Sequence, residues 1–460
     1  MDQITTLSAS STAKLIATRA VSPVEVAEAY LAQIEQLNPQ LNAIATLAPD
    51  VEQKAREAEA AVMRGDNLGP LHGLPLTIKD TIETAGVRTT SGSAMRAQFV
   101  PDKDAPSVAR LKAAGAIILG KTNAAEMAMD YTADNPVFGR TNNPHKLSHT
   151  PGGSSGGEAA AIATGMSPAG LGSDLAGSIR IPAHFCGVVG LKPTTGTVPG
   201  EGQFPQSIGP YSLGAVIGPM ARRVEDLELL FDVLAGTPQS ASEDLRGCRV
   251  AWYTSDEVAP VTTDTRAAVR AAASALAEAG LLPEETRPPG VKSGHDLWLK
   301  LFSRASVVQL RNVYSGHEEQ GGDFVRWRLA TADSAPIPTL DEYINAWMER
   351  DRLRQELLRW MNDVPLLLAP VGASNALVHD SLKVNVDGTN LSVFKAFSYS
   401  QTFNVFDLPA VCIPAGTSAE GLPIGVQIVG RPLAERTVLA AAAIVEKALG
   451  GWRAPTSAMV

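Results

Sequence analysis

Two clusters of glycine and serine are the residues of this chain best suited to chemistry. The first is GGSSGG at 152–157, and the second is GSDLAGS at 172–178. Glycine tolerates backbone conformations that other residues avoid, and it lets the chain approach a bound group closely. A serine hydroxyl becomes a useful nucleophile only when a base takes its proton. The pattern therefore indicates catalysis by a serine, provided that the chain supplies a base.

A candidate base is Lys79, which lies in the apolar, β-branched run LPLTIKDTI. A lysine with the ordinary pKa of about 10.4 is protonated at pH 7 and cannot accept a proton. Burial disfavours the ammonium form and lowers the pKa, and the apolar neighbours Leu74, Leu76 and Ile78 predict such burial. Asp80 follows directly, but successive side chains of a strand point to opposite faces. We therefore expect the Asp80 carboxylate to lie away from the Lys79 amine.

Each feature also has an ordinary structural interpretation. A GGSSGG string is most often a flexible linker, but here it leads directly into the helix-forming sequence EAAAIATG. Ser178 could cap a helix, Asp174 could serve a turn, and Lys79 could be an edge-strand lysine. The Gly-x-Ser-x-Gly pattern at 152–156 matches the nucleophile elbow of α/β-hydrolases, which requires a buried strand just before it. The preceding RTNNPHKLSHT is polar and argues against that elbow.

A third glycine motif, GAIILGKT at 115–122, satisfies the P-loop pattern Gly-x-x-x-x-Gly-Lys-Thr. A phosphate-binding loop exposes its backbone N–H groups to the ligand. The four variable positions of this motif are alanine, isoleucine and leucine, which favour a buried strand. We therefore predict a core strand followed by a turn at Gly120, and no nucleotide site.

Several long motifs, in order along the chain, resemble the amidase signature family. They are LHGLPLTIKD at 71–80, GKTNAAE at 120–126, NPVFGRTNNP at 135–144, PGGSSGG at 151–157, LGSDLAGSIRIP at 171–182, GLKPTTGTVP at 190–199, LPAVCIPAG at 408–416 and GLPIGVQIVG at 421–430. The resemblance covers nearly the whole chain except about 240–360. Motifs of this length and order are specific.

The resemblance implies a Ser–Ser–Lys triad. Its nucleophile would be Ser178, its base Lys79, and its bridging serine Ser154, which lies on a cis peptide in the family. The proton of Ser178 would pass through Ser154 to Lys79, and the same relay would later protonate the departing amine. The resemblance implies no cofactor and no metal ion. A non-catalytic binding protein would be expected to lose at least one of these three residues, and all three are present.

The resemblance also assigns residues around the nucleophile. The oxyanion hole would consist of the backbone N–H groups of Leu175, Ala176, Gly177 and Ser178. Such donors each stabilise a tetrahedral oxyanion by about 3 kcal/mol. The loop would be supported by Ser155, Asp174 and Arg180. The family usually has glycine where this chain has Ala176, so residue 176 must have a backbone conformation that an L-residue tolerates.

The order of apolar and amphipathic segments predicts an α/β fold with a central mixed β-sheet covered by helices on both faces. Strands are predicted at PLTIK, AIILG, PAGLGS, CRVAWY, PLLLAP, AVCIPA and GVQIV. Helices fall between them, including 263–279 and 435–449. Continuous apolar runs of this kind are typical of strands buried on both faces. We expect a single amidase domain over 1–460, with a helical cap at about 285–360 inserted in it.

The composition fits a large enzyme. The 460 residues are 45% hydrophobic and carry a net charge of −9, which argues against nonspecific nucleic-acid binding. The isolated cysteines Cys186, Cys248 and Cys412 suit a reducing compartment and form no metal pattern. The N-terminus lacks the apolar core of a signal peptide, and no apolar run reaches membrane-spanning length. We therefore expect a cytoplasmic monomer or homodimer that needs only its substrate and water.

The substrate class is less sharply indicated. The resemblance implies hydrolysis of an aryl or alkyl amide, a carbamate (urethane) or an ester. In the family, the sequence around Met127, Met129 and Tyr131 borders the acyl pocket, and these side chains suit an apolar or aromatic acyl group. Four of the six tryptophans lie in the predicted cap, where they could line the pocket or simply pack: Trp298, Trp327, Trp347 and Trp360. The alternative is the glutaminase component of a tRNA-dependent amidotransferase, which would use glutamine and require a partner protein.

Overall fold

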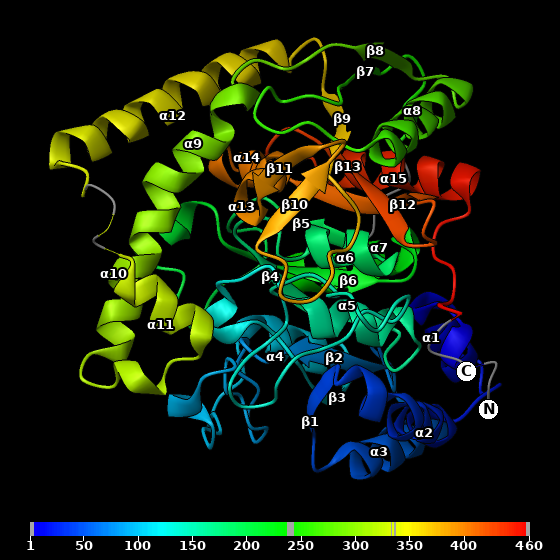
Figure 1. Cartoon of the computed structure of the whole chain (residues 1–460). Helices are drawn as coiled ribbons and strands as arrows, with labels where there is room; N and C mark the ends of the chain where they lie inside the picture. The colour runs from blue at the N-terminus through cyan, green and yellow to red at the C-terminus, as the bar shows by residue number, and fades with distance from the viewer. Residues whose placement is uncertain (1–3, 237–242, 333, 335–336, 457–460) are drawn as a thin grey trace.

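The computed structural model describes residues 4–236, 243–332, 334 and 337–456. Its centre is an eleven-stranded sheet in the order β1-β3-β2-β4-β6-β5-β12-β13-β9-β7-β8 (Figure 1). The strands are β1 (Ile44–Leu47), β2 (Pro75–Lys79), β3 (Ile117–Thr122), β4 (Ala169–Asp174), β5 (Val189–Lys192), β6 (Val216–Ala221), β7 (Arg249–Trp252), β8 (Leu282–Glu285), β9 (Leu366–Pro370), β12 (Ala410–Thr417) and β13 (Pro423–Val429). A separate hairpin pairs β10 (Lys383–Val386) with β11 (Thr389–Ser392).

The sheet is mixed, as predicted. Strand β2 runs parallel to both β3 and β4, whereas β4 pairs with β6 antiparallel. The helices are α1 (Ala9–Ala17), α2 (Pro23–Leu41), α3 (Val51–Arg64), α4 (Pro106–Ala113), α5 (Gly156–Ala163), α6 (Arg180–Cys186), α7 (Val224–Ala235), α8 (Thr263–Glu278), α9 (Gly294–Trp298), α10 (Arg304–Tyr314), α11 (Asp323–Ala330), α12 (Leu340–Trp360), α13 (Val393–Ala396), α14 (Ser398–Val405) and α15 (Glu435–Leu449). No helix among the described residues combines the length and the apolarity that a membrane crossing requires.

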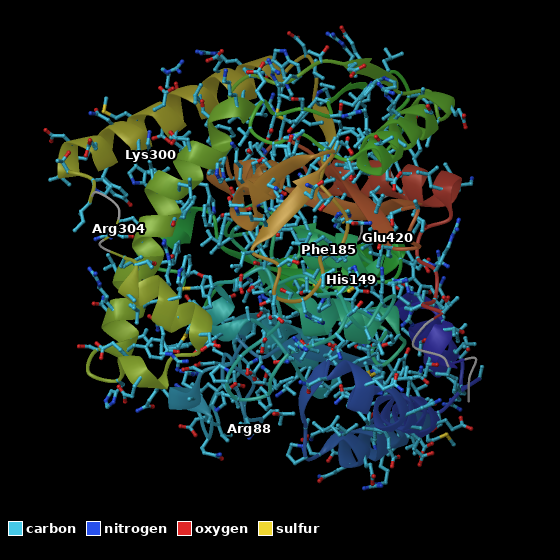
Figure 2. All side chains as sticks on the ribbon, viewed as in Figure 1. Arg88, His149, Phe185, Lys300, Arg304 and Glu420 are labelled. Atoms are coloured by element: carbon cyan, nitrogen blue, oxygen red, sulfur yellow. The ribbon has the colours of Figure 1, made fainter. Side chains whose placement is uncertain are left out.

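Helices cover both faces of the sheet because successive side chains of the central strands point to opposite sides. In β9, Leu366 and Leu368 pack in one core with side chains of α7, α8 and α15. Leu367 and Ala369 pack in the other core with side chains of α6 and α14. Phe185 of α6 belongs to this second core and lies near the middle of the molecule in Figure 2. The continuous apolar runs in the sequence thus correspond to strands buried on both faces.

The prediction of a turn at Gly120 is wrong. Strand β3 continues through Gly120 to Thr122 and pairs there with β1. A Cβ atom on Gly120 would collide with the carbonyl oxygen of Thr46, so glycine serves close strand pairing at this position. Lys121 is buried, and its Nζ donates to Thr84 Oγ1 at 2.9 Å. The lysine of the P-loop pattern therefore belongs to the core.

The segment between β8 and β9 is largely helical in its described residues. Helices α9, α10 and α11 run down one side of the molecule, and α12 extends above them (yellow and yellow-green in Figure 1). A π-helical turn at Leu299–Ser303 joins α9 to α10. The labelled Lys300 and Arg304 mark this junction in Figure 2. Helices α9 to α12 are called the helical segment below, and they lie where the sequence predicts a helical cap.

Candidate active site

The structure brings Lys79 and Ser154 together at the carboxyl end of β2. Lys79 is fully buried, and its Nζ donates to Ser154 Oγ at 2.6 Å and to Ser173 Oγ at 3.0 Å. The Gly153–Ser154 peptide is cis. Ser173 lies near the end of β4, which pairs with β2 in parallel, so the two strand ends meet. Ser173 cannot be identified from the sequence, because the link between the two strands depends on their register.

Burial lowers the pKa of Lys79 to about 7, although the carboxylates of Asp174 and Glu158 oppose this shift. A large share of the molecules therefore carry a neutral Lys79 near pH 7. Asp80 lies outside this cluster, since its carboxylate accepts hydrogen bonds from Thr90 N and Thr90 Oγ1. Its placement agrees with the expected alternation of side chains along the strand.

Ser178 lies in the loop that connects β4 to α6. The residue at the N-cap position of α6 is Ile179, so Ser178 does not cap this helix. The first glycine–serine cluster packs directly on this loop, where Ser155 N donates to the carbonyl oxygen of Ser178 at 3.2 Å. Ser155 Oγ also donates to the carbonyl oxygen of Ser173 at 3.3 Å. The two clusters in the sequence therefore form one site.

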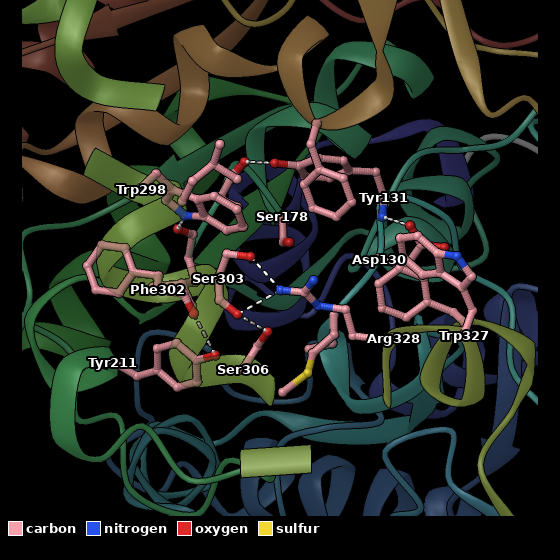
Figure 3. A pocket seen from close by; sticks show the side chains of 17 residues that line it. Asp130, Tyr131, Ser178, Tyr211, Trp298, Phe302, Ser303, Ser306, Trp327 and Arg328 are labelled. Atoms are coloured by element: carbon pink, nitrogen blue, oxygen red, sulfur yellow. Dashed lines mark hydrogen bonds between the residues drawn. The ribbon is translucent and has the colours of Figure 1, made fainter. Parts of the chain in front are cut away.

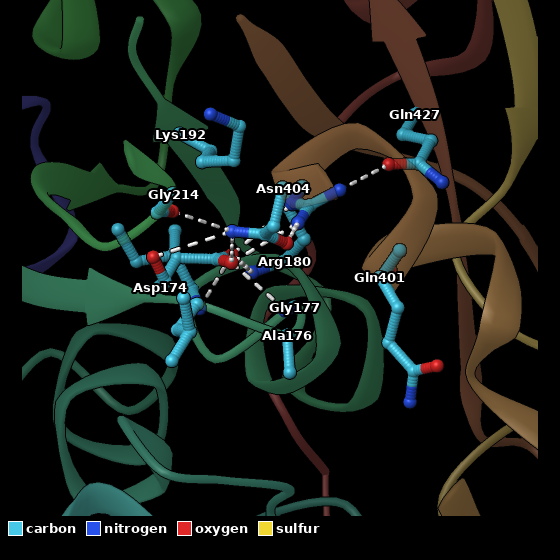
Figure 4. Close-up of polar contacts among 12 residues, drawn as sticks. Asp174, Ala176, Gly177, Arg180, Lys192, Gly214, Gln401, Asn404 and Gln427 are labelled. Atoms are coloured by element: carbon cyan, nitrogen blue, oxygen red, sulfur yellow. Dashed lines mark hydrogen bonds and ion pairs between the residues drawn. The ribbon is translucent and has the colours of Figure 1, made fainter. Parts of the chain in front are cut away.

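A buried ionic network fixes the Ser178 loop (Figure 4). Asp174 Oδ1 accepts from Gly177 N at 2.8 Å, and Asp174 Oδ2 accepts from Ile179 N at 3.1 Å. Arg180 pairs with Asp174 at 3.0 Å and also donates to Asn404 Oδ1 and Gln427 Oε1. Although burial opposes ionisation of Asp174, the Arg180 guanidinium holds its pKa well below the usual range. The loop is thus bonded to a charge pair that is itself anchored to α14 and β13.

The backbone of the loop presents hydrogen-bond donors near Ser178. Within the described residues, the N–H groups of Leu175, Ala176 and Ser178 have no acceptor, whereas the Gly177 N–H donates to Asp174. Of residues 176 and 177, only Gly177 has a positive φ, of 106°. Alanine is therefore accommodated at 176 without strain, as the sequence requires.

Two side chains from distant segments orient this loop. Trp298 Nε1 donates to the carbonyl oxygen of Leu175 at 3.1 Å. Tyr131 Oη donates to the carbonyl oxygen of Ala176 at 2.9 Å and accepts from Gln401 Nε2 at 2.8 Å. The C=O and N–H of a planar trans peptide point in opposite directions. Fixing the carbonyl of Leu175 therefore also fixes the direction of the Ala176 N–H.

A cavity of about 180 Å³ opens onto Ser178, and seven of the residues that line it are aromatic. The rings are those of Tyr131, Tyr211, Trp298, Phe302, Phe324, Trp327 and Phe394. In the view of Figure 3, Ser178 lies between Trp298 and Tyr131, with Arg328 opposite. Arg328 donates to the carbonyl oxygen of Ser303 at 2.8 Å and to Ser303 Oγ at 2.5 Å. The cavity is therefore apolar in most of its wall, with one guanidinium held by neutral acceptors.

The residues expected to border the acyl pocket divide between two cavities. Met129 and Tyr131 line the large aromatic cavity. Met127 lines a second cavity of about 50 Å³, whose wall also includes Met129, Ser154 and Ser178. The four tryptophans divide as well. Trp298 and Trp327 line the aromatic cavity, whereas Trp347 packs against Phe302 and Trp360 packs against the core.

Comparison with known families agrees with this site. The chain matches the Amidase family over residues 25–439. The protein belongs to the amidase signature family. Members of this family hydrolyse carbon–nitrogen bonds, and the chain is such a hydrolase. The family match spans both glycine–serine clusters and the helical segment, so it includes every side chain of the site described above.

Similar proteins differ in the amides they act on. The chain is 32% identical to fatty-acid amide hydrolase 2 of Homo sapiens, over 98% of this chain and 90% of that protein. It is 34% identical to a glutamyl-tRNA(Gln) amidotransferase component of a Synechococcus strain, over 94% of this chain and 90% of that protein. The structure of a bacterial aryl acylamidase matches with a TM-score of 0.85 and 26% identity, over 96% of each chain. Membership of this amidase family is thus clear, whereas the identity of the substrate is not given by similarity alone.

Proposed function

We propose that this amidase hydrolyses small-molecule amides with an apolar or aromatic acyl group, through an acyl-enzyme on Ser178. The observation that carries the proposal is the aromatic cavity, which opens onto Ser178 beside the buried pair of Lys79 and Ser154. An apolar acyl group gains free energy when it leaves water for such a wall, about 25 cal/mol for each Å² buried. Met129 and Tyr131 contribute to this wall.

Acylation uses the neutral form of Lys79. Its amine accepts the Ser154 proton, while Ser154 takes the proton of Ser178. Ser178 Oγ then forms a bond to the substrate carbonyl carbon, and the oxyanion that results is stabilised by backbone N–H groups. The geometry favours the donors that have no other acceptor, which are those of Leu175, Ala176 and Ser178.

Collapse of the tetrahedral intermediate breaks the C–N bond. The relay returns its proton through Ser154 to the leaving nitrogen, which departs as a neutral amine. A water molecule then attacks the Ser178 ester under the same base catalysis and gives the carboxylic acid and the free serine. Carbamates and esters share this acyl-enzyme chemistry, so we expect them to be cleaved as well.

Glutamine is a second candidate substrate, because two charged side chains line the aromatic cavity. Arg328 and Asp130 could bind the carboxylate and the ammonium of a free amino acid. Both are already bonded to neutral groups, Arg328 to Ser303 and Asp130 to Tyr131 N and Thr132 Oγ1. The similarity to a glutamyl-tRNA(Gln) amidotransferase component supports the same interpretation. The seven aromatic rings of the wall favour the apolar amide.

A matched substrate panel tests the proposal. It consists of an alkyl amide, an anilide, an aryl carbamate and an ester of one acyl group, together with free glutamine, each assayed with wild type and with Ser178→Ala. We expect hydrolysis of the apolar amides by the wild type and its loss in the variant. Hydrolysis of glutamine alone would transfer support to the second candidate, and activity retained by Ser178→Ala would contradict the proposed nucleophile.

A further inference from the structure

Two segments that lie far apart in the sequence share the wall of the aromatic cavity. One is the loop after β3, which contributes Met129 and Asp130. The other is α11 of the helical segment, which contributes Phe324, Trp327 and Arg328 (Figure 3). The width of the cavity therefore depends on how α11 is held against this loop.

The side chain of Glu126, at the start of the loop, joins the two segments. Glu126 is only 4% exposed. Its Oε1 accepts a hydrogen bond from Tyr314 Oη at 2.6 Å, and its Oε2 accepts one from Gly322 N at 2.8 Å. Tyr314 is the last residue of α10, and Gly322 is the N-cap residue of α11. One carboxylate thus bonds to both ends of the connection between these helices.

Glycine at position 322 makes the close approach of α11 possible. A Cβ atom on Gly322 would lie 2.7 Å from Glu126 Oε2 and 3.0 Å from Pro136 Cδ. A side chain at this position would therefore force the start of α11 away from the carboxylate. The absence of a Cβ atom supports a specific fit between Glu126 and α11.

A small apolar cluster lies beside this carboxylate and is separate from the main cores. Its buried members are Met127 of the loop, Leu310 and Tyr314 of α10, and Val325 of α11. Apolar packing is non-directional, whereas a hydrogen bond has preferred distances and angles. We therefore assign the exact placement of α11 to the two bonds of Glu126 and only its general attachment to the cluster.

The backbone of the loop also depends on its surroundings. Met127 and Ala128 have positive φ angles of 55° and 57°, which are uncommon for residues with a side chain. Such conformations persist where neighbouring contacts hold them in place. The bonds of Glu126 lie directly before these two residues, so their loss would affect the loop as well as α11.

We propose that Glu126 is a positioning residue for substrate selectivity, whose carboxylate holds α11 against the loop at the spacing that fits an aromatic acyl group. This inference rests on the proposed function and assigns its selectivity to a residue outside the cavity wall. The bonds of Glu126 do not involve the lysine and serines of the relay. Loss of these bonds should therefore weaken binding of large acyl groups and leave the chemical step in place.

The first test replaces Glu126 in two ways. Glu126→Leu removes both acceptors. Glu126→Gln can keep both contacts, because its amide oxygen can accept from Gly322 N and its amide nitrogen can donate to Tyr314 Oη. The tyrosine proton then passes to Ser93 Oγ, which lies 2.8 Å from Tyr314 Oη.

The values of kcat and KM are measured for the amides of an aromatic acid and of acetic acid. In Glu126→Leu, we expect KM for the aromatic amide to rise about tenfold, the lower end of the cost of lost apolar contacts in a pocket. Its kcat and both constants for the acetyl amide should stay close to wild type, which is the pattern for lost binding without lost catalysis. Glu126→Gln should behave like wild type for both amides.

Amide hydrogen exchange tests the contact without turnover. The N–H of Gly322 is one of the two donors to Glu126, so the start of α11 should exchange faster in Glu126→Leu than in wild type. In Glu126→Gln, exchange should match wild type. Tyr314→Phe removes the other donor and keeps the ring, and it should raise the ratio of aromatic to acetyl KM in the same direction as Glu126→Leu.

Glu435→Leu is the matched control. Glu435 is also buried and also accepts from a neutral backbone donor, Thr194 N at 2.7 Å, but it lies at the start of α15. Its replacement should lower stability and leave the ratio of the two KM values unchanged. A merely structural role for Glu126 would give the same result as this control.

The outcomes separate this inference from the proposed function. An unchanged ratio of KM values in Glu126→Leu and Tyr314→Phe would overturn the role of Glu126 alone, as would a loss in Glu126→Gln equal to that in Glu126→Leu. Absence of Ser178-dependent hydrolysis of both amides by the wild type would overturn the proposed function and the assigned selectivity together.

Discussion

The catalytic centre and the helical segment that walls the substrate cavity are built in different ways. At the centre, Lys79, Asp174 and Arg180 are almost completely buried, and each is hydrogen-bonded to neighbours from other elements. The helical segment contributes rings from α9, the π-helical turn and α11 to the cavity wall, and one of them, Trp327, is 53% exposed. Buried hydrogen bonds and an ion pair fix the positions of the side chains at the centre. In the helical segment, the shape of the cavity depends on side-chain packing.

This difference implies that the catalytic centre determines whether any substrate reacts, whereas the helical segment determines which substrates are preferred. A change at the centre leaves a buried charge or donor without its partner, which costs several kcal/mol. A change of one ring in the cavity wall alters the fit of the acyl group and leaves the base and nucleophile in place. We therefore expect substitutions at the centre to affect every substrate and substitutions in the segment to affect only some.

The largest expected effect comes from Lys79→Met, which removes the base. We expect kcat/KM for all amides to fall about 10³-fold or more. In the wild type, kcat/KM should rise as the pH increases through about 7, because burial lowers the pKa of Lys79 to that value and the neutral amine is the base. Profiles of kcat/KM between pH 5 and 9 measure both effects.

Lys121→Met is the matched control, since Lys121 is also buried, its pKa is also lowered by burial to about 7, and its Nζ bonds to Thr84 away from the serines. This variant should keep the rise in kcat/KM with pH. If Lys121→Met lost that rise and Lys79→Met kept it, the assignment of the base would be wrong.

The next effect is on stability. Asp174→Asn leaves the buried Arg180 without its counter-charge, and we expect a loss of about 3–5 kcal/mol in the free energy of unfolding. The lowered pKa of Asp174 means that its contribution is present above pH about 4 and is lost only as the pH falls further, so the difference should persist from pH 5 to 8. Urea unfolding measures it.

The matched change in the helical segment is Asp323→Asn, which breaks an exposed pair with Arg326. No change in the unfolding midpoint is expected there, because an exposed ion pair contributes little. Equal losses of unfolding free energy in Asp174→Asn and Asp323→Asn would contradict the expected difference between the catalytic centre and the helical segment.

A smaller and substrate-dependent effect is expected for Trp327→Ala. This ring lines the aromatic cavity and contacts Phe324 with centroids 5.9 Å apart. We expect kcat/KM for amides with an aromatic acyl group to fall about 5- to 10-fold, a loss of about 1–1.4 kcal/mol and at the lower end of the cost of lost apolar contacts in a pocket. The acetyl amide should be unaffected. Met348→Ala, another exposed apolar residue of the segment, is the control. A uniform loss for both acyl groups would place Trp327 in the reaction itself.

The smallest effect is expected for Ser173→Ala. Ser173 Oγ accepts a hydrogen bond from Lys79 Nζ, and such a bond favours the ammonium form. Without it the pKa of Lys79 falls further, so the rise in kcat/KM should move to lower pH. Ser155→Ala is the control, because the Ser155 hydroxyl bonds to the Ser173 backbone instead. A shift to higher pH would contradict the role given to this hydrogen bond.

Much of the sheet is predictable from the sequence because buried strands are continuous apolar runs. PLTIK and PLLLAP lie at the predicted places in β2 and β9. Strand β6 (VIGPMA) is missed since glycine and proline interrupt its apolar pattern, and β8 (LPEE) is missed because it is polar and largely exposed. The turn expected at Gly120 fails for a related reason. Close pairing with β1, which depends on tertiary contact, requires glycine within the strand.

Within the site, local motifs carry Lys79, Ser154 and Ser178, so the sequence identifies them. The other residues of the site are brought there by contacts between segments that lie far apart in the sequence. The bond from Trp298 to the Leu175 carbonyl joins residues 123 positions apart, and no periodicity indicates it. Residues that act through such contacts emerge only from the structure.

The most direct test of the central claim is to trap the acyl-enzyme. The enzyme is mixed with an aryl carbamate bearing an apolar group, a substrate expected to acylate quickly and to deacylate slowly, and is digested and mapped by mass spectrometry. The structure predicts one adduct of the carbamoyl mass on the peptide that contains Ser178, and none in Ser178→Ala. An adduct on another residue, or continued turnover by Ser178→Ala, would contradict the proposed mechanism.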